Sequence, residues 1–338
     1  MKIVVTGGLG YIGSHTVVAL QHEGHEVFVI DDLSNTTIDV KNKIESISGK
    51  AIHFTELDLK EKEAVFNYFD SHKNIDGVIH FAASKAVNES LEDPLKYYEN
   101  NLNTLVYLLQ ACKKYAVRNF IFSSSCTVYG EPDALPITES SHVKQATSPY
   151  GNTKQIGEEI LVDCSNAFDL NVISLRYFNP IGAHASAEIG ELPVGVPQNL
   201  VPFITQTAAG IREQLLVFGD DYPTKDGSCI RDYIHVVDLA EAHVKALDRL
   251  LNKDSKESLE VFNVGTGKGT SVLEIIKAFE KVTRQKLNYK IVDRRPGDVM
   301  QIYADTTKAN QVLGWKARFS LEECLASAWN WEQNIRKQ

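Results

Sequence analysis

The sequence predicts an α/β protein built on a Rossmann-type doubly wound parallel sheet, with a smaller mixed α/β lobe at its C-terminal end. Three observations support this class. Short β-branched runs alternate with longer amphipathic stretches through the first half of the chain. These runs are almost continuously apolar, which is typical of parallel strands covered on both faces. A glycine-rich segment also follows the first run directly, as it does in dinucleotide-binding domains.

The first half contains six expected strands and four expected helices. We expect the strands at 3–6, 27–30, 52–54, 78–82, 120–124 and 172–178. Helical periods at 12–22, 59–72, 94–115 and 149–168 lie between them. Because strands and helices alternate in this way, the sheet is expected to be parallel, with helices on both faces.

The chain changes character after residue 178. Residues 179–231 are rich in Pro, Gly and Asn, which predicts loops and one helix near 200–210. An expected strand and helix follow at 233–251, then a strand at 261–264 and helices from Ser271 and from Leu321. We therefore expect a first domain of residues 1–178, to which 233–262 return, and a lobe of residues 179–232 and 263–338.

Composition narrows the class of function. The chain has 338 residues and a net charge of −9. Because binding of nucleic acid requires a basic face, no nucleic-acid partner is expected. No run approaches the roughly 20 apolar residues that span a bilayer, so no membrane segment and a cytoplasmic location are expected. The five cysteines are scattered and no histidine pair has helical metal-ligand spacing; we therefore expect neither disulfides nor a bound metal.

The glycine-rich segment runs from Gly7 to Gly13 and includes Gly10. It ends an expected strand and opens an expected helix. Glycines let the chain turn sharply and bring main-chain N–H groups against a pyrophosphate, which also lies at the positive end of the helix. The segment therefore predicts that the first domain binds a dinucleotide.

Asp31 ends the second expected strand, close to the usual spacing of about 20 residues after such a loop. A carboxylate there accepts hydrogen bonds from the adenosine ribose and repels a 2′-phosphate. The predicted cofactor is therefore NAD rather than NADP. The alternative is a structural turn followed by an unrelated aspartate.

Tyr150 is the tyrosine followed by a lysine four residues later, Lys154. Ser148 and Pro149 mark a helix start, so both side chains lie on one helix face. A nearby ammonium and a cationic nicotinamide ring favour the phenolate, which can act as a base. Ser123, Ser124 and Ser125 end the fifth expected strand, at the sheet edge where ligands bind. An exposed helix face is the alternative interpretation of the Tyr-Lys pair.

This combination resembles the extended short-chain dehydrogenase/reductase superfamily and, within it, the UDP-glucose (UDP-galactose) 4-epimerase family. The similar segments cover almost the whole chain. They are residues 6–14, 31–35, 80–85, 97–103, 122–130, 148–154, 176–184, 195–202, 219–235 and 294–305.

The resemblance implies three sets of site residues. Ser125, Tyr150 and Lys154 would be catalytic. The NAD site would comprise Gly7, Gly10, Tyr11, Ile12, Gly13, Asp31, Asp32, Leu33, Ser34, Asn35, Thr36, Asp58, Leu59, Phe81, Ala82, Ala83, Ser84, Lys85, Asn100 and Phe178, together with the catalytic three. The UDP-sugar would contact Lys85, Ser125, Tyr150, Asn179, Asn199, Leu200, Leu216, Val217, Phe218, Arg231, Tyr233, Arg295 and Asp298.

The implied activity is reversible epimerisation of UDP-glucose and UDP-galactose at carbon 4, through a transient 4-keto sugar, with NAD retained throughout. Galactose metabolism and a homodimer, joined through 94–115 and 149–168, are implied with it. Arg231 and Arg295 can clamp a diphosphate, although nearby acids make surface charge pairing an alternative. Ile302 stands where the family carries either a bulky or a small residue behind the sugar, so acceptance of N-acetyl sugars stays open.

Two other functions are considered. A related 4,6-dehydratase or UDP-glucuronate decarboxylase is the nearest alternative, but dehydratases carry Asp-Glu after the strand-end hydroxyl residue. Here Ser125 is followed by Cys126 and Thr127. A non-catalytic NAD-sensing protein would not need Tyr150, Lys154 and Ser125 together.

Overall fold

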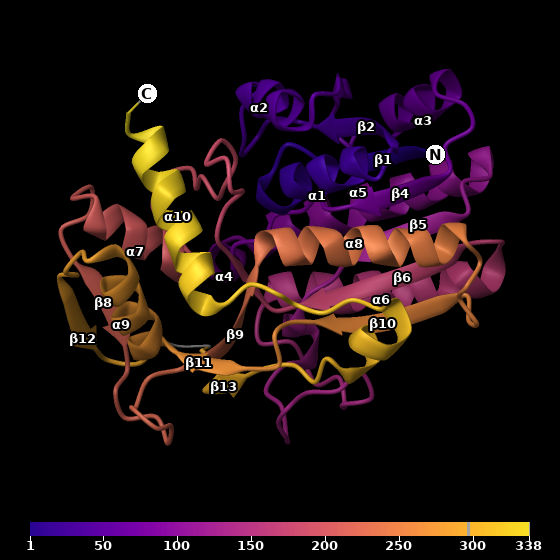
Figure 1. Cartoon of the computed structure of the whole chain (residues 1–338). Coiled ribbons are helices and arrows are strands. Elements are labelled where there is room, and N and C mark those ends of the chain that lie inside the picture. Colours follow the sequence, from indigo (N-terminus) through magenta and orange to yellow (C-terminus); the bar gives the residue numbers. More distant parts are fainter. Residues whose placement is uncertain (296–297, 338) are drawn as a thin grey trace.

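Seven parallel strands form the central sheet of the computed structural model, which describes residues 1–295 and 298–337 (Figure 1). Pro296 and Gly297 of the 294–305 segment, and Gln338 of the predicted lobe, lie outside the described residues. The order across the sheet is β3-β2-β1-β4-β5-β6-β10, which confirms the Rossmann-type doubly wound class. The strands are β1 (Lys2–Thr6), β2 (Glu26–Asp31), β3 (His53–Glu56), β4 (Gly77–His80), β5 (Asn119–Ser123), β6 (Asn171–Tyr177) and β10 (Leu259–Val264).

Helices cover both faces of this sheet, because its strands carry apolar side chains on both sides. In β1, Ile3 and Val5 pack into one core with α1 and α8, while Val4 packs into the opposite core with α3, α5 and α6. The helices of the sheet are α1 (Tyr11–His22), α2 (Asp39–Ser48), α3 (Lys62–Ser71), α4 (Val87–Glu92), α5 (Pro94–Tyr115), α6 (Pro149–Ala167) and α8 (Val236–Leu251).

Local signals predicted the long helices well. Asp93 caps α5 and Ser148 caps α6, each followed by a proline at the first helical position, which is a favoured start. The helices α2 and α4 were not predicted. Each of them buries a single side chain, Ile44 and Ser90 respectively, so neither shows a strong apolar period.

The second lobe lies beside the carboxyl ends of the central strands, at the left of Figure 1. Its core contains Ile204 of α7, Phe279 of α9 and Leu325 of α10. Its elements are β7 (Asn179–Ile181), α7 (Leu200–Ala208), β8 (Leu215–Phe218), β9 (Ile230–His235), β11 (Gly269–Ser271), α9 (Val272–Thr283), β12 (Tyr289–Val292), β13 (Gln301–Ile302) and α10 (Leu321–Ile335). Two further short helices pack against the first domain instead: η1 (Cys126–Tyr129) contacts α6 and β6, and η2 (Ala309–Leu313) contacts α8 and β10.

Five strands of this lobe were missed in the sequence. The expected loops of 179–231 contain β7 and β8, and β11, β12 and β13 lie further on. Each has two to four residues, too few to show a period. They pair with distant segments: β8 with β12, and β9 with β7, β11 and β13.

The segment 233–262 divides between the two parts of the fold. Its first residues belong to β9 in the small sheet, whereas β10 pairs with β6 at the edge of the central sheet and α8 packs against α1. We propose the domain boundaries predicted from the sequence, except that the segment returning to the first domain begins at Val236.

Candidate active site

One large cavity of about 1430 Å³ lies between the carboxyl ends of the central strands and the second lobe. The strand order changes direction between β1 and β4, and such a switch point is where open α/β sheets bind ligands. The predicted site residues that line it are Gly7, Gly10, Tyr11, Ile12, Gly13, Asp31, Asp32, Ser34, Asn35, Thr36, Asp58, Leu59, Phe81, Ala82, Ala83, Ser84, Lys85, Asn100, Tyr150, Lys154, Asn179, Asn199, Leu200, Leu216, Phe218, Arg231, Tyr233, Arg295 and Asp298.

The loop between β1 and α1 has room for main chain and not for side chains. Gly7 has a φ of 66°, and a Cβ there would lie 2.8 Å from the main-chain N of Ala82. A Cβ on Gly13 would lie 2.1 Å from the carbonyl oxygen of Gly7. Among the described residues, no side chain caps the start of α1, so its first N–H groups are available to an anion. The loop therefore fits the pyrophosphate of a dinucleotide.

Asp31 lies at the end of β2 with its carboxylate at the cavity. It accepts hydrogen bonds from the main-chain N–H groups of Leu9, at 3.0 Å, and Leu33, at 3.1 Å. Burial raises the pKa of Asp31, and these two hydrogen bonds oppose the rise. Each carboxylate oxygen can accept a further bond, so Asp31 is suited to hold the ribose hydroxyls of an adenosine.

The loop after β4 forms another wall of the cavity. Asn100 donates to the Ser84 hydroxyl at 3.2 Å. Asn101, which the sequence reasoning did not single out, accepts from the Ser84 N–H at 2.8 Å and donates to the Thr153 hydroxyl at 3.0 Å. It therefore joins this loop to α6 at the residue before Lys154. Its position inside the similar segment 97–103 was the available signal.

Tyr150 and Lys154 lie one turn apart on α6, and both are buried. Lys154 Nζ donates to the Ser123 carbonyl at 2.7 Å and lies 5.9 Å from the centre of the Tyr150 ring. Ser125 begins η1, where its hydroxyl accepts from the Thr127 N–H at 3.2 Å. The end of β5 and the first turns of α6 thus bring the predicted catalytic residues together.

The pKa of each of these groups is governed mainly by burial. Burial raises the pKa of Tyr150 well above its usual value, Tyr177 raises it further, and a hydrogen bond with Ser125 lowers it. Burial also lowers the pKa of Lys154 to about 8, against the opposing charge of Glu158. The protein alone therefore favours the neutral phenol. A nearby positive ring would favour the phenolate.

The two predicted diphosphate ligands, Arg231 and Arg295, approach the same carboxylate. Arg295 donates to both oxygens of Asp298, at 3.1 and 2.7 Å. Arg231 lies 4.0 Å from Asp298 and donates to the Ile230 carbonyl at 2.9 Å. Two cations share one acid, so this wall carries a net positive charge. Both arginines do approach an acid, as the alternative of surface charge pairing supposed, but the three side chains lie in the cavity rather than on the open surface.

Four predicted residues do not line the cavity: Leu33, Ser125, Phe178 and Val217. Leu33 packs partly against the core beside β2, and Ser125 is buried at the start of η1. Phe178 is buried in a cluster that includes Cys126, Val128 and Tyr129 of η1. Val217 faces the core of the second lobe, because alternate side chains of β8 point to opposite faces. Its neighbours Leu216 and Phe218 therefore line the cavity, and its own side chain does not.

The segment 188–198 also lines the cavity, and the sequence reasoning did not assign it a role. Glu191 accepts from Asn199 at 2.6 Å and from Lys85 at 3.1 Å. It therefore connects two predicted substrate residues on opposite walls. Trp331 of α10 supports the segment by donating to the Glu191 carbonyl at 3.0 Å. The part of this loop in the similar segment 195–202 was the available signal.

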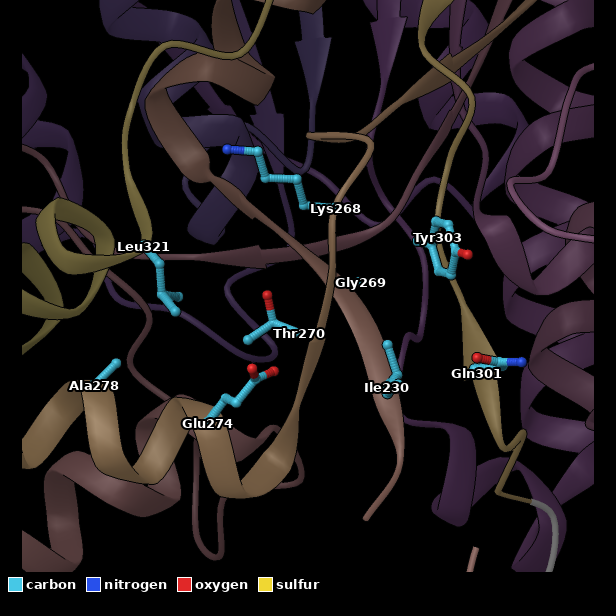
Figure 2. A pocket seen from close by; sticks show the side chains of 9 residues that line it. All are labelled: Ile230, Lys268, Gly269, Thr270, Glu274, Ala278, Gln301, Tyr303 and Leu321. Atoms are coloured by element: carbon cyan, nitrogen blue, oxygen red, sulfur yellow. The ribbon is translucent and has the colours of Figure 1, made fainter. Parts of the chain in front are cut away.

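Ile302 lies on β13 and lines the large cavity. Its neighbours Gln301 and Tyr303 line a shallower pocket of about 650 Å³ instead, together with Ile230 of β9 and Glu274 of α9 (Figure 2). This division follows from strand geometry, because successive side chains point to opposite faces. The small sheet therefore places Ile302 at the cavity, where the sequence predicted a specificity position.

Across residues 1–295 and 298–337, no helix is both long enough and apolar enough to cross a bilayer. Within the same residues, His, Cys, Asp and Glu side chains nowhere form a group of three or more that could hold a metal ion.

Known proteins with similar sequences and structures share a narrow set of descriptions. A family model described as GDP-mannose 4,6 dehydratase matches residues 4–328. A UDP-glucose 4-epimerase of Bacillus subtilis (strain 168) is 52% identical, over 99% of this chain and 97% of that protein.

Two solved structures have nearly the same fold. One is a UDP-glucose 4-epimerase from Stenotrophomonas maltophila with bound NAD and formylated UDP-arabinopyranose, with a TM-score of 0.96 and 45% identity, covering 100% of this chain and 99% of that one. The other, from Bifidobacterium longum in complex with NAD+ and UDP, has a TM-score of 0.95 and 44% identity, covering 99% of both chains.

The match with the relative and with both structures is nearly end to end, so it includes both the sheet and the second lobe. The chain therefore belongs to the UDP-glucose 4-epimerase family, within the wider family that the matching model describes.

Proposed function

We propose that this chain interconverts UDP-glucose and UDP-galactose by reversible epimerisation at carbon 4, with tightly bound NAD. The observation that carries the proposal is that one cavity is lined by the glycine loop, by Tyr150 and Lys154, and by Arg231 and Arg295. A dinucleotide, a proton acceptor and a diphosphate ligand set therefore meet at one place. The descriptions of the relatives support the same reaction.

The residues around Tyr150 divide the proton chemistry between them. The glycine loop and Asp31 would hold NAD, which would supply the hydride chemistry at carbon 4 of the sugar. The Tyr150 phenolate takes the proton of the 4-hydroxyl and gives it back when the second alcohol forms. Lys154 supplies a positive charge one turn away, and the Ser125 hydroxyl orients Tyr150 by hydrogen bonding.

The remote part of the substrate is held by different residues. Arg231 and Arg295 bind the diphosphate while the 4-keto sugar turns between the two hydride transfers. The binding energy of a group that does not react keeps the intermediate in the cavity. Asn179, Asn199 and Lys85 line the same cavity. They are placed to supply polar contacts to either sugar orientation.

The discriminating experiment is an assay of purified protein with UDP-galactose and without added NAD. Formation of UDP-glucose is expected, with part of the retained NAD appearing in reduced form in the absorbance spectrum. A 4-keto-6-deoxy sugar would instead indicate a dehydratase, and release of CO₂ from UDP-glucuronate a decarboxylase. Binding of NAD without any turnover would indicate an NAD-sensing protein.

The chemistry around Ser125 argues against the dehydratase. That reaction needs an additional acid and base to expel water, and the next residues are Cys126 and Thr127. Burial raises the pKa of Cys126 to about 12, so this thiol neither gives nor takes a proton readily at neutral pH. The site therefore lacks the acid–base pair at the position where dehydratases carry it.

Ile302 is proposed to set the size of the sugar pocket. Ile302→Tyr adds a bulky ring at the cavity wall, so we expect it to lower kcat/KM for UDP-N-acetylglucosamine at least about tenfold relative to UDP-glucose. Steady-state kinetics with both sugars tests this. Gln301→Ala, on the other face of β13, is the control and should leave the ratio unchanged. Identical ratios for wild type and Ile302→Tyr would show that this residue is not the gate.

We further propose a homodimer formed through α5 and α6. The half-buried side chains of Tyr98, Leu102 and Val106 recur along α5 at helical spacing, as an interface stripe does. Light scattering should give about twice the chain mass of 37.7 kDa, and Leu102→Glu should give monomers. A monomeric wild type would contradict the dimer.

The cytoplasmic location and the part in galactose metabolism remain predictions.

A further inference from the structure

Three successive serines at the end of β5 have different partners. The Ser123 carbonyl accepts from Lys154, and its hydroxyl donates to Tyr177 at 3.0 Å. The Ser124 hydroxyl donates to Glu158 at 2.6 Å. Ser125 is the proposed catalytic residue. The middle serine therefore points away from the reaction and toward a buried acid.

Glu158 continues the line that Tyr150 and Lys154 begin on α6. The three residues are four positions apart, which places them on one face of the helix. Glu158 Oε1 accepts from Ser124 and, at 3.0 Å, from Arg176 Nε on β6. Both partners of this ion pair are almost fully buried. The Arg176 guanidinium also lies 4.8 Å from the centre of the Tyr129 ring, so its position is held from a second side.

The cluster of Ser124, Glu158 and Arg176 is separate from the ligand cavity. Over the described residues, the cavity lining includes Ser123, Tyr150 and Lys154, and it does not include Ser124, Glu158 or Arg176. A buried ion pair is weak evidence for stability alone, because desolvation offsets much of the attraction. Its placement directly behind the reacting groups requires another explanation.

We propose that Glu158 is a positioning residue for the Tyr150–Lys154 pair. Through its hydrogen bond with Ser124 it holds the Ser123–Ser125 turn against α6. Its carboxylate, paired with Arg176, also places a negative charge one turn from Lys154. This inference rests on the proposed function, because it concerns the residues that move the proton. Glu158 touches neither ligand; it acts through the turn and through its charge.

The sign of the charge effect can be worked out. The carboxylate of Glu158 raises the pKa of Lys154, against the larger effect of burial. Glu158→Gln removes this negative charge and leaves the Arg176 cation unpaired, so the pKa values of both Lys154 and Tyr150 should fall. The pH profile of kcat should then move to lower pH, by roughly one to two units for a unit charge one helix turn away at the effective dielectric constant of protein sites. Other ionisable groups also face these residues. Tyr97, Tyr177 and Cys126 lie near Tyr150, and Tyr129 and Glu139 lie near the ion pair. His80 lies near Lys154, and burial lowers its pKa to about 3.

Three variants separate the tether from the charge. Ser124→Ala removes the hydrogen bond between Ser124 and Glu158 and keeps the charges of Glu158 and Arg176. We therefore expect kcat to fall three- to tenfold, with KM and the pH profile of kcat unchanged. Glu158→Gln keeps an oxygen acceptor for Ser124 and should move the profile. The double variant Glu158→Gln with Arg176→Met removes both charges and should return the profile to the wild-type position. If the cluster were merely structural, all three variants would be less stable, and the pH profile of kcat would not move in Glu158→Gln and return in the double variant.

A second measurement does not depend on turnover. In NAD-bound protein labelled with ¹³C-lysine, the Lys154 signal, assigned by its loss in Lys154→Met, should titrate at lower pH in Glu158→Gln than in wild type. Unchanged titration, together with a wild-type kcat in Ser124→Ala, would overturn the inference. If wild type itself fails to convert UDP-galactose, the proposed function fails, while the Lys154 titration still decides the role of Glu158.

Discussion

Tyr150→Phe should lower kcat at least about 100-fold, because general acid–base catalysis of this kind contributes about 10² to 10⁴ in rate. The variant removes one oxygen from a buried ring and leaves the glycine loop and the arginine wall intact. Retention of NAD and the affinity for UDP should therefore remain close to wild type. The measurements are steady-state turnover of UDP-galactose, the NAD content of the purified protein, and calorimetric titration with UDP.

A matched control for this variant is Tyr115→Phe. Tyr115 also loses one hydroxyl group, which donates to the Phe66 carbonyl at 3.1 Å, but it lies on α5 outside the cavity lining. It should retain wild-type turnover. Near-wild-type activity of Tyr150→Phe would contradict the catalytic assignment, even if NAD and UDP still bind.

Gly13→Ala should abolish NAD retention, and with it almost all activity. The new Cβ would lie 2.1 Å from the Gly7 carbonyl oxygen and 2.8 Å from the Gly8 Cα. Because both of these are main-chain atoms, they can move away from the new Cβ only if the whole loop moves. The N–H groups at the start of α1 would then lose their alignment with the pyrophosphate. We expect less than about a tenth of the wild-type NAD content in protein purified without added cofactor, since a loss of roughly 1.4 kcal/mol already weakens binding tenfold.

The control is Gly49→Ala at the end of α2. Gly49 also has a positive φ, of 68°, but a Cβ there meets nothing within 4 Å. This substitution should lower the free energy of unfolding by about 1 kcal/mol through backbone strain and leave the NAD content unchanged. If Gly13→Ala retained a full complement of NAD, the glycine loop would not be the pyrophosphate site.

Much of the first domain was predictable, because its signals are local. The apolar run of β1, the glycines after it and the serine–proline start of α6 each act within a few residues. The i,i+4 spacing of Tyr150 and Lys154 similarly follows from helix geometry alone. For these features the neighbouring residues are sufficient to determine the backbone.

The second lobe was predicted less completely. Strands such as β8 and β12 form only because residues 215–218 pair with residues 289–292, and short strands gain little from their own sequence. Glu191 was missed for the same reason, since its partner Lys85 lies 106 positions away. Spacing along the chain contains no signal for such a contact.

The sequence by itself therefore determined the nucleotide-binding fold and the preference for NAD, and it predicted Tyr150 as the reacting tyrosine, because each of these depends on short-range geometry and on the chemistry of single side chains. The tertiary structure decided the rest. It places Lys154 on the Ser123 carbonyl, Ser124 on Glu158, and Arg231 and Arg295 on one carboxylate. These contacts join elements far apart in the chain, and their energies exist only once the core brings those elements together.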